Sequence, residues 1–246
     1  MCDFCKDLFS GVLASIIAVL VFELYKFFLK KLENYKLKKL FGNDDILYFI
    51  VPELEVDVNN LKPNITHPLK HKGLQKSISS HSLLGMADVL ALKYIQELLF
   101  NKLKNKMYLS TDIEQKGKLD ISLVSFGSSS IYCNQIISYI NKEYNIDDKN
   151  IYYNNQQIWT IDNVYDYGLI IKFNSGDVRN RTWVIIAGLG ETGTKGAAWY
   201  LSYNWKKIVK KFGENSFAIV VKVKHGYEQK VEVVSENQIA KKDGDN

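Results

Sequence analysis

The chain has 246 residues, of which 46% are hydrophobic and 24% are charged. This length suits one ordinary domain with additional segments, and the hydrophobic content excludes a wholly disordered chain. The 32 lysines and arginines exceed the 27 acidic residues, and the resulting net charge of +5 suits an anionic ligand or an acidic membrane surface without establishing either.

The first predicted element is an apolar helix near the N-terminus. Residues 8–22 carry no charge, and the apolar pattern continues to Leu29. As a helix, the segment 8–29 is long enough to cross the ~30 Å hydrocarbon core of a bilayer. A cleaved signal peptide fits poorly, because acidic residues interrupt the stretch before it. We predict a single transmembrane helix; the alternative is a buried helix at the start of a soluble domain.

The flanking charges predict the orientation of this helix. Lys6 alone precedes the apolar segment, beside two aspartates. The lysines at or beyond its other end are Lys26, Lys30, Lys31, Lys36, Lys38 and Lys39. The positive-inside rule therefore predicts a single-pass protein of the cell membrane, with its N-terminus outside and its C-terminal domain in the cytoplasm.

Small residues recur at a spacing of four within the apolar segment, which lets helices approach one another closely. The pairs are Ser10 with Ala14, Gly11 with Ser15, and Ala14 with Ala18. Either these helices self-associate in the bilayer, or the small residues are ordinary membrane-helix composition. Glu23 either lines the mouth of a pore in an oligomer or pairs with a nearby lysine at the interface. We expect a homo-oligomer, with these residues as candidate membrane or pore residues.

The chain is expected to divide into three segments. The apolar helix continues as a basic stalk that stops at Gly42, so residues 1–42 form the membrane helix and stalk. Residues 43–237 form a cytosolic domain, and residues 238–246 form a flexible tail. Within the domain, the polar stretch 57–81 shows no clear period and is expected to be a loop.

Apolar runs alternate with helical patterns through the domain. Strands are predicted at 46–51, 121–126, 158–161, 169–173, 182–187 and 217–223, and helices at 83–103, from 135 to 142 and at 194–212. The strands at 158–161 and 169–173 are expected to form an antiparallel pair. Continuous apolar strands that alternate with helices predict an α/β fold with a mostly parallel sheet and helices on both faces.

A G-x-G-x-x-G motif follows the predicted strand 182–187 and opens the next helix. Glycines allow a close approach of the backbone to a ligand, and unpaired N–H groups at a helix start favour an anion. The candidate ligand-binding residues are Gly188, Gly190, Glu191, Thr192, Gly193, Thr194 and Lys195. A dinucleotide-dependent dehydrogenase fits poorly, because Lys222 and Lys224 stand where an acidic residue would hold a ribose.

A second Gly/Ser turn has the same pattern after the strand 121–126. Its candidate ligand-binding residues are Gly127, Ser128, Ser129, Ser130 and Asn134. In a parallel sheet both loops lie at the carboxyl ends of the strands, which favours a nucleotide-like ligand or a short oligonucleotide. Alternatively, both are ordinary strand-to-helix connections. Asp162 and Asp166 either supply a carboxylate near this ligand or belong to a polar turn. No cofactor, metal site or catalytic residue is predicted.

The two loops, residues 125–130 with Asn134 and residues 187–194, resemble Rossmann-like sensor domains of prokaryotic antiviral systems. They are similar to the CARF and SLOG groups, which bind nucleotide second messengers and are often fused to an effector segment. The resemblance implies a membrane-anchored effector that senses a nucleotide or cyclic oligonucleotide and oligomerises or forms a pore in antiviral defence. The SLOG glycosidases carry a glutamate where this chain has Gly196 and Ala197, which argues against an enzyme of that type. The alternatives are a membrane-tethered nucleotide or nucleoside hydrolase or transferase, and a scaffold.

Overall fold

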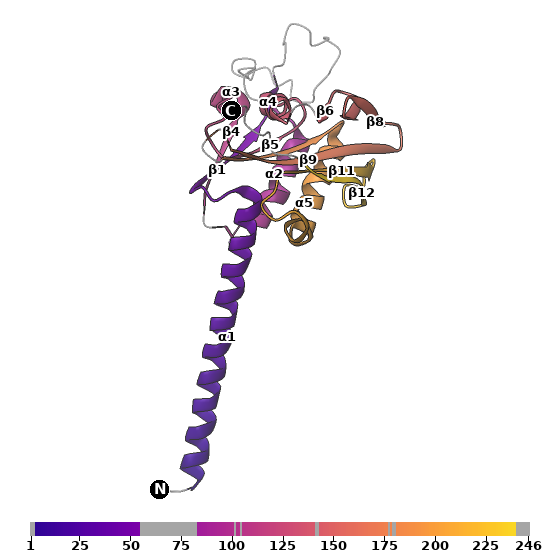
Figure 1. Cartoon of the computed structure of the whole chain (residues 1–246). Helices are drawn as coiled ribbons and strands as arrows, with labels where there is room; N and C mark the ends of the chain where they lie inside the picture. The colour runs from indigo at the N-terminus through magenta and orange to yellow at the C-terminus, as the bar shows by residue number, and fades with distance from the viewer. Residues whose placement is uncertain are drawn as a thin grey trace, which may run out of the picture.

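The computed structural model of the chain describes a long helix that leads into an α/β domain (Figure 1). The described residues are 3–54, 83–100, 102–103, 105–140, 143–176, 178 and 181–239, and the side chains of residues 3–14, 54 and 83 lie outside this description. The predicted loop 57–81 and most of the predicted tail also lie outside the described residues.

Helix α1 (Asp3–Phe41) projects from the domain as a stalk and then enters its core (Figure 1). Its 39 residues give a length of about 58 Å at 1.5 Å per residue. Leu37, Leu40 and Phe41 are buried in the domain. Gly42 ends the helix: its φ of +94° is left-handed, and its N–H donates to the Lys38 carbonyl at 2.9 Å. The helix therefore ends at the residue that the sequence predicted.

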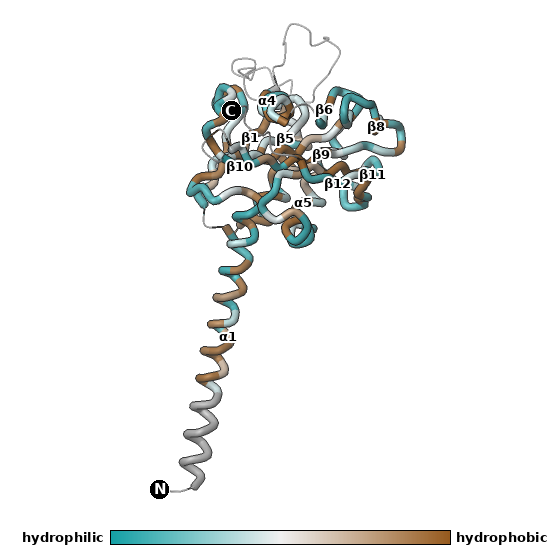
Figure 2. The backbone as a smooth tube through the Cα atoms, in the orientation of Figure 1, coloured by the Kyte–Doolittle hydropathy of each residue, from teal (hydrophilic) through white to brown (hydrophobic). Residues whose placement is uncertain are grey.

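The middle of the projecting part of α1 is apolar, and Figure 2 shows it mostly in brown between the grey first turns and the mixed turns nearer the domain. Large apolar side chains from Ile16 to Leu29 are 43–62% exposed. Judged over the described residues alone, none of the helices combines the length and apolarity needed to cross a membrane.

The central sheet has seven strands in the order β12-β11-β9-β10-β5-β1-β4. They are β1 (Ile46–Val51), β4 (Lys106–Thr111), β5 (Leu123–Phe126), β9 (Tyr165–Ser175), β10 (Arg181–Gly188), β11 (Phe217–Lys224) and β12 (Val231–Gln238). The pairs β4–β1, β1–β5 and β5–β10 are parallel. The pairs β10–β9, β9–β11 and β11–β12 are antiparallel. The α/β fold is confirmed, but the sheet is mixed rather than mostly parallel, because β9 returns beside β10 as a hairpin partner.

Helices and a small sheet cover the two faces of this sheet. The end of α1, α2 (Met86–Leu99) and α5 (Glu191–Phe212) bury one hydrophobic cluster. Helix α4 (Ile131–Tyr139) and the sheet β6-β7-β8 (Tyr144–Ile146, Asn150–Tyr153 and Gln156–Thr160) bury the other. Three short elements, β2 (Glu53–Leu54), β3 (Leu83–Leu84) and α3 (Asp112–Gln115), lie at the carboxyl ends of β1 and β4. Helices on both faces are confirmed.

Several predicted elements differ from the observed ones. The predicted pair 158–161 with 169–173 is wrong, because β8 pairs with β7. Strands β4 and β12 were not predicted; both are edge strands with largely exposed or half-exposed residues. Helix α2 is shorter than 83–103, while α4 and α5 begin several residues before the predicted starts. Ile239 is 3% exposed and donates its N–H to the Ser216 carbonyl at 3.0 Å, so the predicted tail begins too early.

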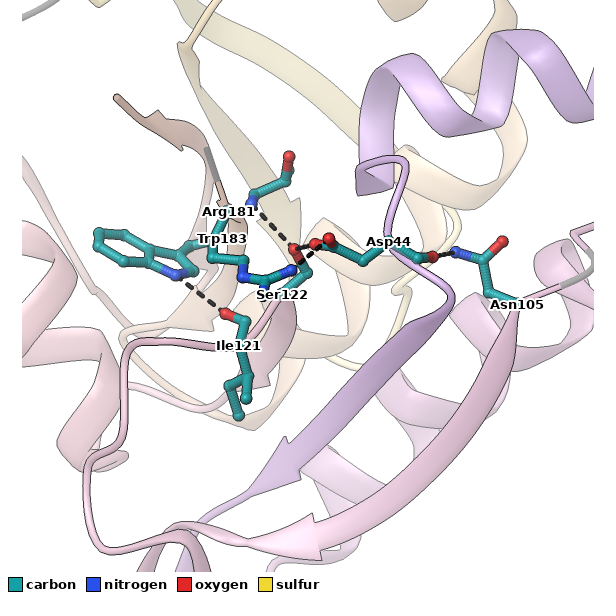
Figure 3. A network of polar contacts seen from close by, with 7 residues as sticks. Asp44, Asn105, Ile121, Ser122, Arg181 and Trp183 are labelled. Atoms are coloured by element: carbon teal, nitrogen blue, oxygen red, sulfur yellow. Dashed lines mark hydrogen bonds and ion pairs between the residues drawn. The ribbon is translucent and has the colours of Figure 1, made fainter. Parts of the chain in front are cut away.

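A polar network fixes the base of the stalk to the sheet (Figure 3). The Asp44 carboxylate, just beyond α1, accepts from the Arg181 guanidinium and the Ser122 hydroxyl. The Asn105 amide donates to the Asp44 carbonyl, and the Thr182 N–H donates to Ser122 Oγ at 3.0 Å. The network therefore joins the end of α1 to the amino ends of β4, β5 and β10.

Candidate functional site

The two predicted ligand loops lie side by side at the carboxyl ends of parallel strands. β5 and β10 are neighbours, with Phe126 opposite Ile186. The Gly127 N–H donates to the Ile186 carbonyl at 3.0 Å, which ties the start of one loop to the strand that carries the other. This edge is where ligands bind in open α/β sheets.

The N–H groups of the glycine motif are bound by a carboxylate of the chain itself. Asp166, at the start of β9, is fully buried. Its Oδ1 accepts from Gly190 N at 3.0 Å and from Tyr167 N at 2.7 Å, and its Oδ2 accepts from Gly193 N at 2.7 Å. Asp166 therefore occupies the position at the start of α5 where a phosphate was expected.

The glycines of this motif also allow α5 to pack closely against the sheet. A Cβ on Gly193 would lie 2.8 Å from Asp166 Oδ1 and even nearer to the Tyr167 carbonyl. A Cβ on Gly196, one turn later, would lie 2.5 Å from Val223 Cγ2. The glycine pattern is thus explained by close packing of the backbone and by its hydrogen bonds to the Asp166 carboxylate.

The start of α4 has the same arrangement. Ser130 caps the helix by accepting from Tyr132 N at 3.3 Å, and Ser125 Oγ donates to Ser130 Oγ at 2.8 Å. Asp112, which is 3% exposed, accepts from Ile131 N at 3.1 Å through Oδ2. A second buried carboxylate therefore binds one main-chain N–H at the start of α4, beside the second predicted anion site.

The remaining predicted residues fall into an accessible and a buried group. The exposed or half-buried residues are Ser128, Ser129, Asn134, Glu191 and Lys195, whereas Gly127, Gly188, Thr192 and Thr194 are buried. Thr194 Oγ1 donates to the Gly190 carbonyl at 3.3 Å, within the helix start. A ligand at this edge would meet mainly the accessible group, and the predicted ligand-binding role of these residues stays a prediction.

Asp88, in the first turn of α2, was not predicted as a site residue. It lies at the carboxyl ends of β1 and β5: a Cβ on Gly127 would be 2.9 Å from Asp88 Oδ1 and 3.0 Å from Pro52 Cγ. Burial, and secondarily the charge of Glu191, raise the pKa of the Asp88 carboxyl to about 6. A perturbed carboxyl at this position is typical of a functional site. The sequence signal was weak, because acidic residues are common in first turns of helices.

The order of the strands singles out this part of the edge. From β1 the chain adds β4 on one side and then returns to place β5 on the other side. The crevice at such a reversal is the usual ligand position in doubly wound sheets. Asp88 and the Gly127–Ser128 turn lie there, whereas the glycine motif lies one strand further along.

Positive charge is found at the same edge, beyond β9. Lys222 Nζ lies 3.9 Å from the Tyr165 ring centroid, and His225 Nε2 lies 2.8 Å from the Asp162 carbonyl. Asp162 is exposed, and its pKa is lowered by hydrogen bonds from the Tyr165 and Val164 N–H groups and then by the charges of Lys222 and His225. The edge thus combines an acidic part near Asp88 with a basic part at the end of β11.

The candidate membrane residues lie along α1. The side chains of Ser10, Gly11 and Ala14 are outside the described part, and Ser15 and Ala18 are exposed. Glu23 forms an ion pair with Lys26 at 2.9 Å, and both side chains are exposed. This ion pair agrees with the alternative in which Glu23 pairs with a nearby lysine. A role for Glu23 in lining a pore requires an oligomer and stays a prediction.

Across the described residues, no group of three histidine, cysteine or carboxylate side chains could hold a metal ion. Comparisons with protein-family models, with curated proteins and with solved structures give no match to this chain.

Proposed function

We propose that α1 anchors this protein in the cell membrane as a single transmembrane helix, with the α/β domain on the cytoplasmic side. The observation that carries this proposal is the exposure of every large apolar side chain from Ile16 to Leu29, each at 43–62%. A helix on a water-facing surface has one apolar and one polar face. Residues 15–22 have no charged residue on any face through more than two turns.

The energetic cost of leaving this segment in water supports the same conclusion. Burying one large apolar side chain is worth ~1.5–3 kcal/mol, so eleven of them correspond to roughly 15–30 kcal/mol. A bilayer supplies this burial on all sides of the helix. The sequence segment 8–29 would be about 33 Å long, which matches the hydrocarbon core.

The anchoring and its orientation are tested with the chain's own cysteines. Cys2 and Cys5 precede the apolar segment, while Cys133 is buried in the domain. On intact cells, a membrane-impermeant maleimide is expected to label the full chain but not a Cys2→Ser/Cys5→Ser variant. Alkaline carbonate is expected to leave the chain in the membrane. Release by carbonate would refute the anchor, and labelling that requires cell lysis would refute the orientation.

We propose further that the domain is a sensor for a nucleotide or short, cyclic oligonucleotide at the carboxyl edge of the sheet. The adjacent β5 and β10 loops, their accessible hydroxyl and amide groups, and Lys222 and His225 support this ligand class. Because Asp166 occupies the Gly190 and Gly193 N–H groups and Asp112 occupies the Ile131 N–H group, we assign the phosphate contacts to lysines. Ligand binding would favour one assembly state of a homo-oligomer, which could act on the membrane by clustering or pore formation in antiviral defence.

Native mass spectrometry of the purified full chain tests this ligand class. A co-purifying nucleotide is expected with the wild-type chain and with Lys106→Gln, an exposed control at the amino end of β4 on the opposite edge of the sheet, and its occupancy should fall in Lys222→Gln. Equal occupancy in all three would exclude the lysine contact. A ligand-free chain that binds no member of a nucleotide panel would favour the scaffold alternative.

An enzyme is the second candidate, and Asp88 is the observation that favours it. A carboxyl with a pKa of about 6 at the switch point suits general acid–base catalysis near neutral pH. A nucleotide or nucleoside hydrolase or transferase would lose most turnover in Asp88→Asn and retain it in Asp148→Asn, which changes an exposed carboxylate on the β6–β7 turn. Turnover that survives Asp88→Asn would remove Asp88 from this role.

A further inference from the structure

A basic groove lies between the end of α1 and the second half of α5, where the stalk enters the domain. It has a volume of about 480 Å³, and Leu32 and Val209 are among its apolar lining residues. The lysines that line it are Lys36, Lys39, Lys206, Lys207 and Lys210. We call it the stalk groove.

The lysines of the stalk groove are only partly neutralised. Lys206 pairs with Glu33 at 2.7 Å, and Lys39 pairs with Glu214 at 3.4 Å. Lys36, Lys207 and Lys210 form no ion pair with any other described residue. Five lysines and two carboxylates leave three uncompensated positive charges around one groove, an arrangement that favours a bound anion.

The position of the stalk groove along α1 indicates the source of that anion. Lys36 lies seven residues beyond Leu29, or about 10 Å along the helix axis. The polar layer on each side of a bilayer is about 5–7 Å thick. If the apolar segment ends near Leu29, lysine side chains reaching toward the bilayer come within range of the headgroup phosphates.

We infer that the stalk groove binds the headgroup phosphate of an anionic phospholipid in the bilayer that holds α1. This inference rests on the proposed membrane anchoring. The lysines neutralise the phosphate, and the apolar side chains of Leu32 and Val209 contact the lipid next to the headgroup. Binding at a groove shared by α1 and α5 fixes the tilt of the domain on the membrane surface.

The test uses the full chain in micelles of a neutral detergent, titrated with short-chain phosphatidylglycerol. The tryptophan fluorescence of the chain reports binding through Trp205, one of its four tryptophans, because Lys206 Nζ lies 5.4 Å from the Trp205 ring centroid. Each lysine near an anionic surface contributes about 1 kcal/mol, so Lys207→Gln/Lys210→Gln is expected to weaken binding roughly thirtyfold. Lys207→Arg/Lys210→Arg should retain it. The control Lys118→Gln/Lys149→Gln changes two exposed lysines outside the groove and should bind like the wild type.

Two further arms identify the source of the phosphate. Phosphatidylcholine and inorganic phosphate are both expected to bind far more weakly than phosphatidylglycerol. Inorganic phosphate that binds as tightly as the lipid would overturn the inference in favour of a site for a free anion. Equal lipid affinity of the glutamine variant and the control would overturn it outright. Carbonate extraction separates this inference from the proposed membrane anchoring. A chain that stays in the membrane but shows no preference for the anionic lipid would refute lipid binding at the stalk groove and leave the anchoring intact.

Discussion

Replacing Asp166 by asparagine should destabilise the domain strongly, although it changes only one atom and one charge. Asp166 is fully buried, and its Oδ2 accepts from Gly193 N at 2.7 Å. An asparagine oxygen at the Oδ1 position can still accept from Gly190 and Tyr167. Its NH₂ group would then face the Gly193 N–H, so that a buried donor loses its acceptor.

The magnitude follows from the bonds that change. An unsatisfied buried donor costs ~1–3 kcal/mol, and the two retained bonds lose their charge assistance, at ~0.5–1.5 kcal/mol each. The free energy of unfolding should therefore fall by about 2–6 kcal/mol, a large share of the ~5–15 kcal/mol of an ordinary domain. For a domain of this size, at ~2–4 °C per kcal/mol, the Tm should fall by roughly 4–24 °C.

Thermal unfolding of the full chain in detergent, followed by tryptophan fluorescence to which the buried Trp183 and Trp205 contribute, measures this change. Asp162→Asn is the matched control. Asp162 is exposed and accepts from Val164 N at 2.6 Å and Tyr165 N at 2.7 Å through the same oxygen, which asparagine retains. Its Tm should change little. Equal Tm values for both variants would refute the assignment of Asp166 as the internal acceptor of the glycine motif.

Three titratable groups give further predictions. Folding raises the pKa of the Asp88 carboxyl from 3.8 to about 6, so the protonated form favours folding at low pH and this stabilisation is lost as the pH rises through that window. In urea unfolding, Asp88→Asn should therefore be more stable than the wild type by about 1–2 kcal/mol above pH 7 and equally stable near pH 4. Burial lowers the pKa of Lys172 from 10.5 to about 8, so stability should rise between these pH values, and Lys172→Met should abolish that rise. Burial raises the pKa of the Cys133 thiol to about 12; in a Cys2→Ser/Cys5→Ser chain, a thiol reagent should therefore label Cys133 only on unfolding.

The sequence predicts the buried strands well and the edge strands poorly, for a physical reason. β10 and β11 are buried on both faces, so their continuous apolar runs were recognised at nearly the observed bounds. β12 alternates half-buried and exposed residues, many of them polar, and its pattern was taken for loop and tail. β4 lies at the other edge and carries Lys106, Ser110 and Thr111, so its apolar run is only three residues long and did not stand out as a strand.

The candidate site illustrates a limit of motif spacing. The G-x-G-x-x-G pattern correctly predicted a tight strand–turn–helix with donors at the start of α5. It could not show that their acceptor is Asp166, which lies 24 residues before Gly190 and is brought close only by the antiparallel pairing of β9 with β10. Asp88 depends on tertiary structure in the same way, because its pKa reflects burial between strands that are distant in sequence.

One strand connects the two ends of the proposed mechanism. β10 begins at Arg181, which binds Asp44 at the base of the stalk, and ends at Gly188, where the glycine loop starts. Its eight residues span about 26 Å at 3.3 Å per residue. A packed strand of this kind has one stable arrangement, so it does not carry a signal by stretching. A ligand at the carboxyl edge would therefore act by changing how whole domains associate, and the clamped junction at Asp44 would turn that change into a movement of α1. Arg181→Gln should accordingly leave ligand binding intact while uncoupling it from the membrane helix, and a loss of both in a folded variant would contradict a rigid-body mechanism.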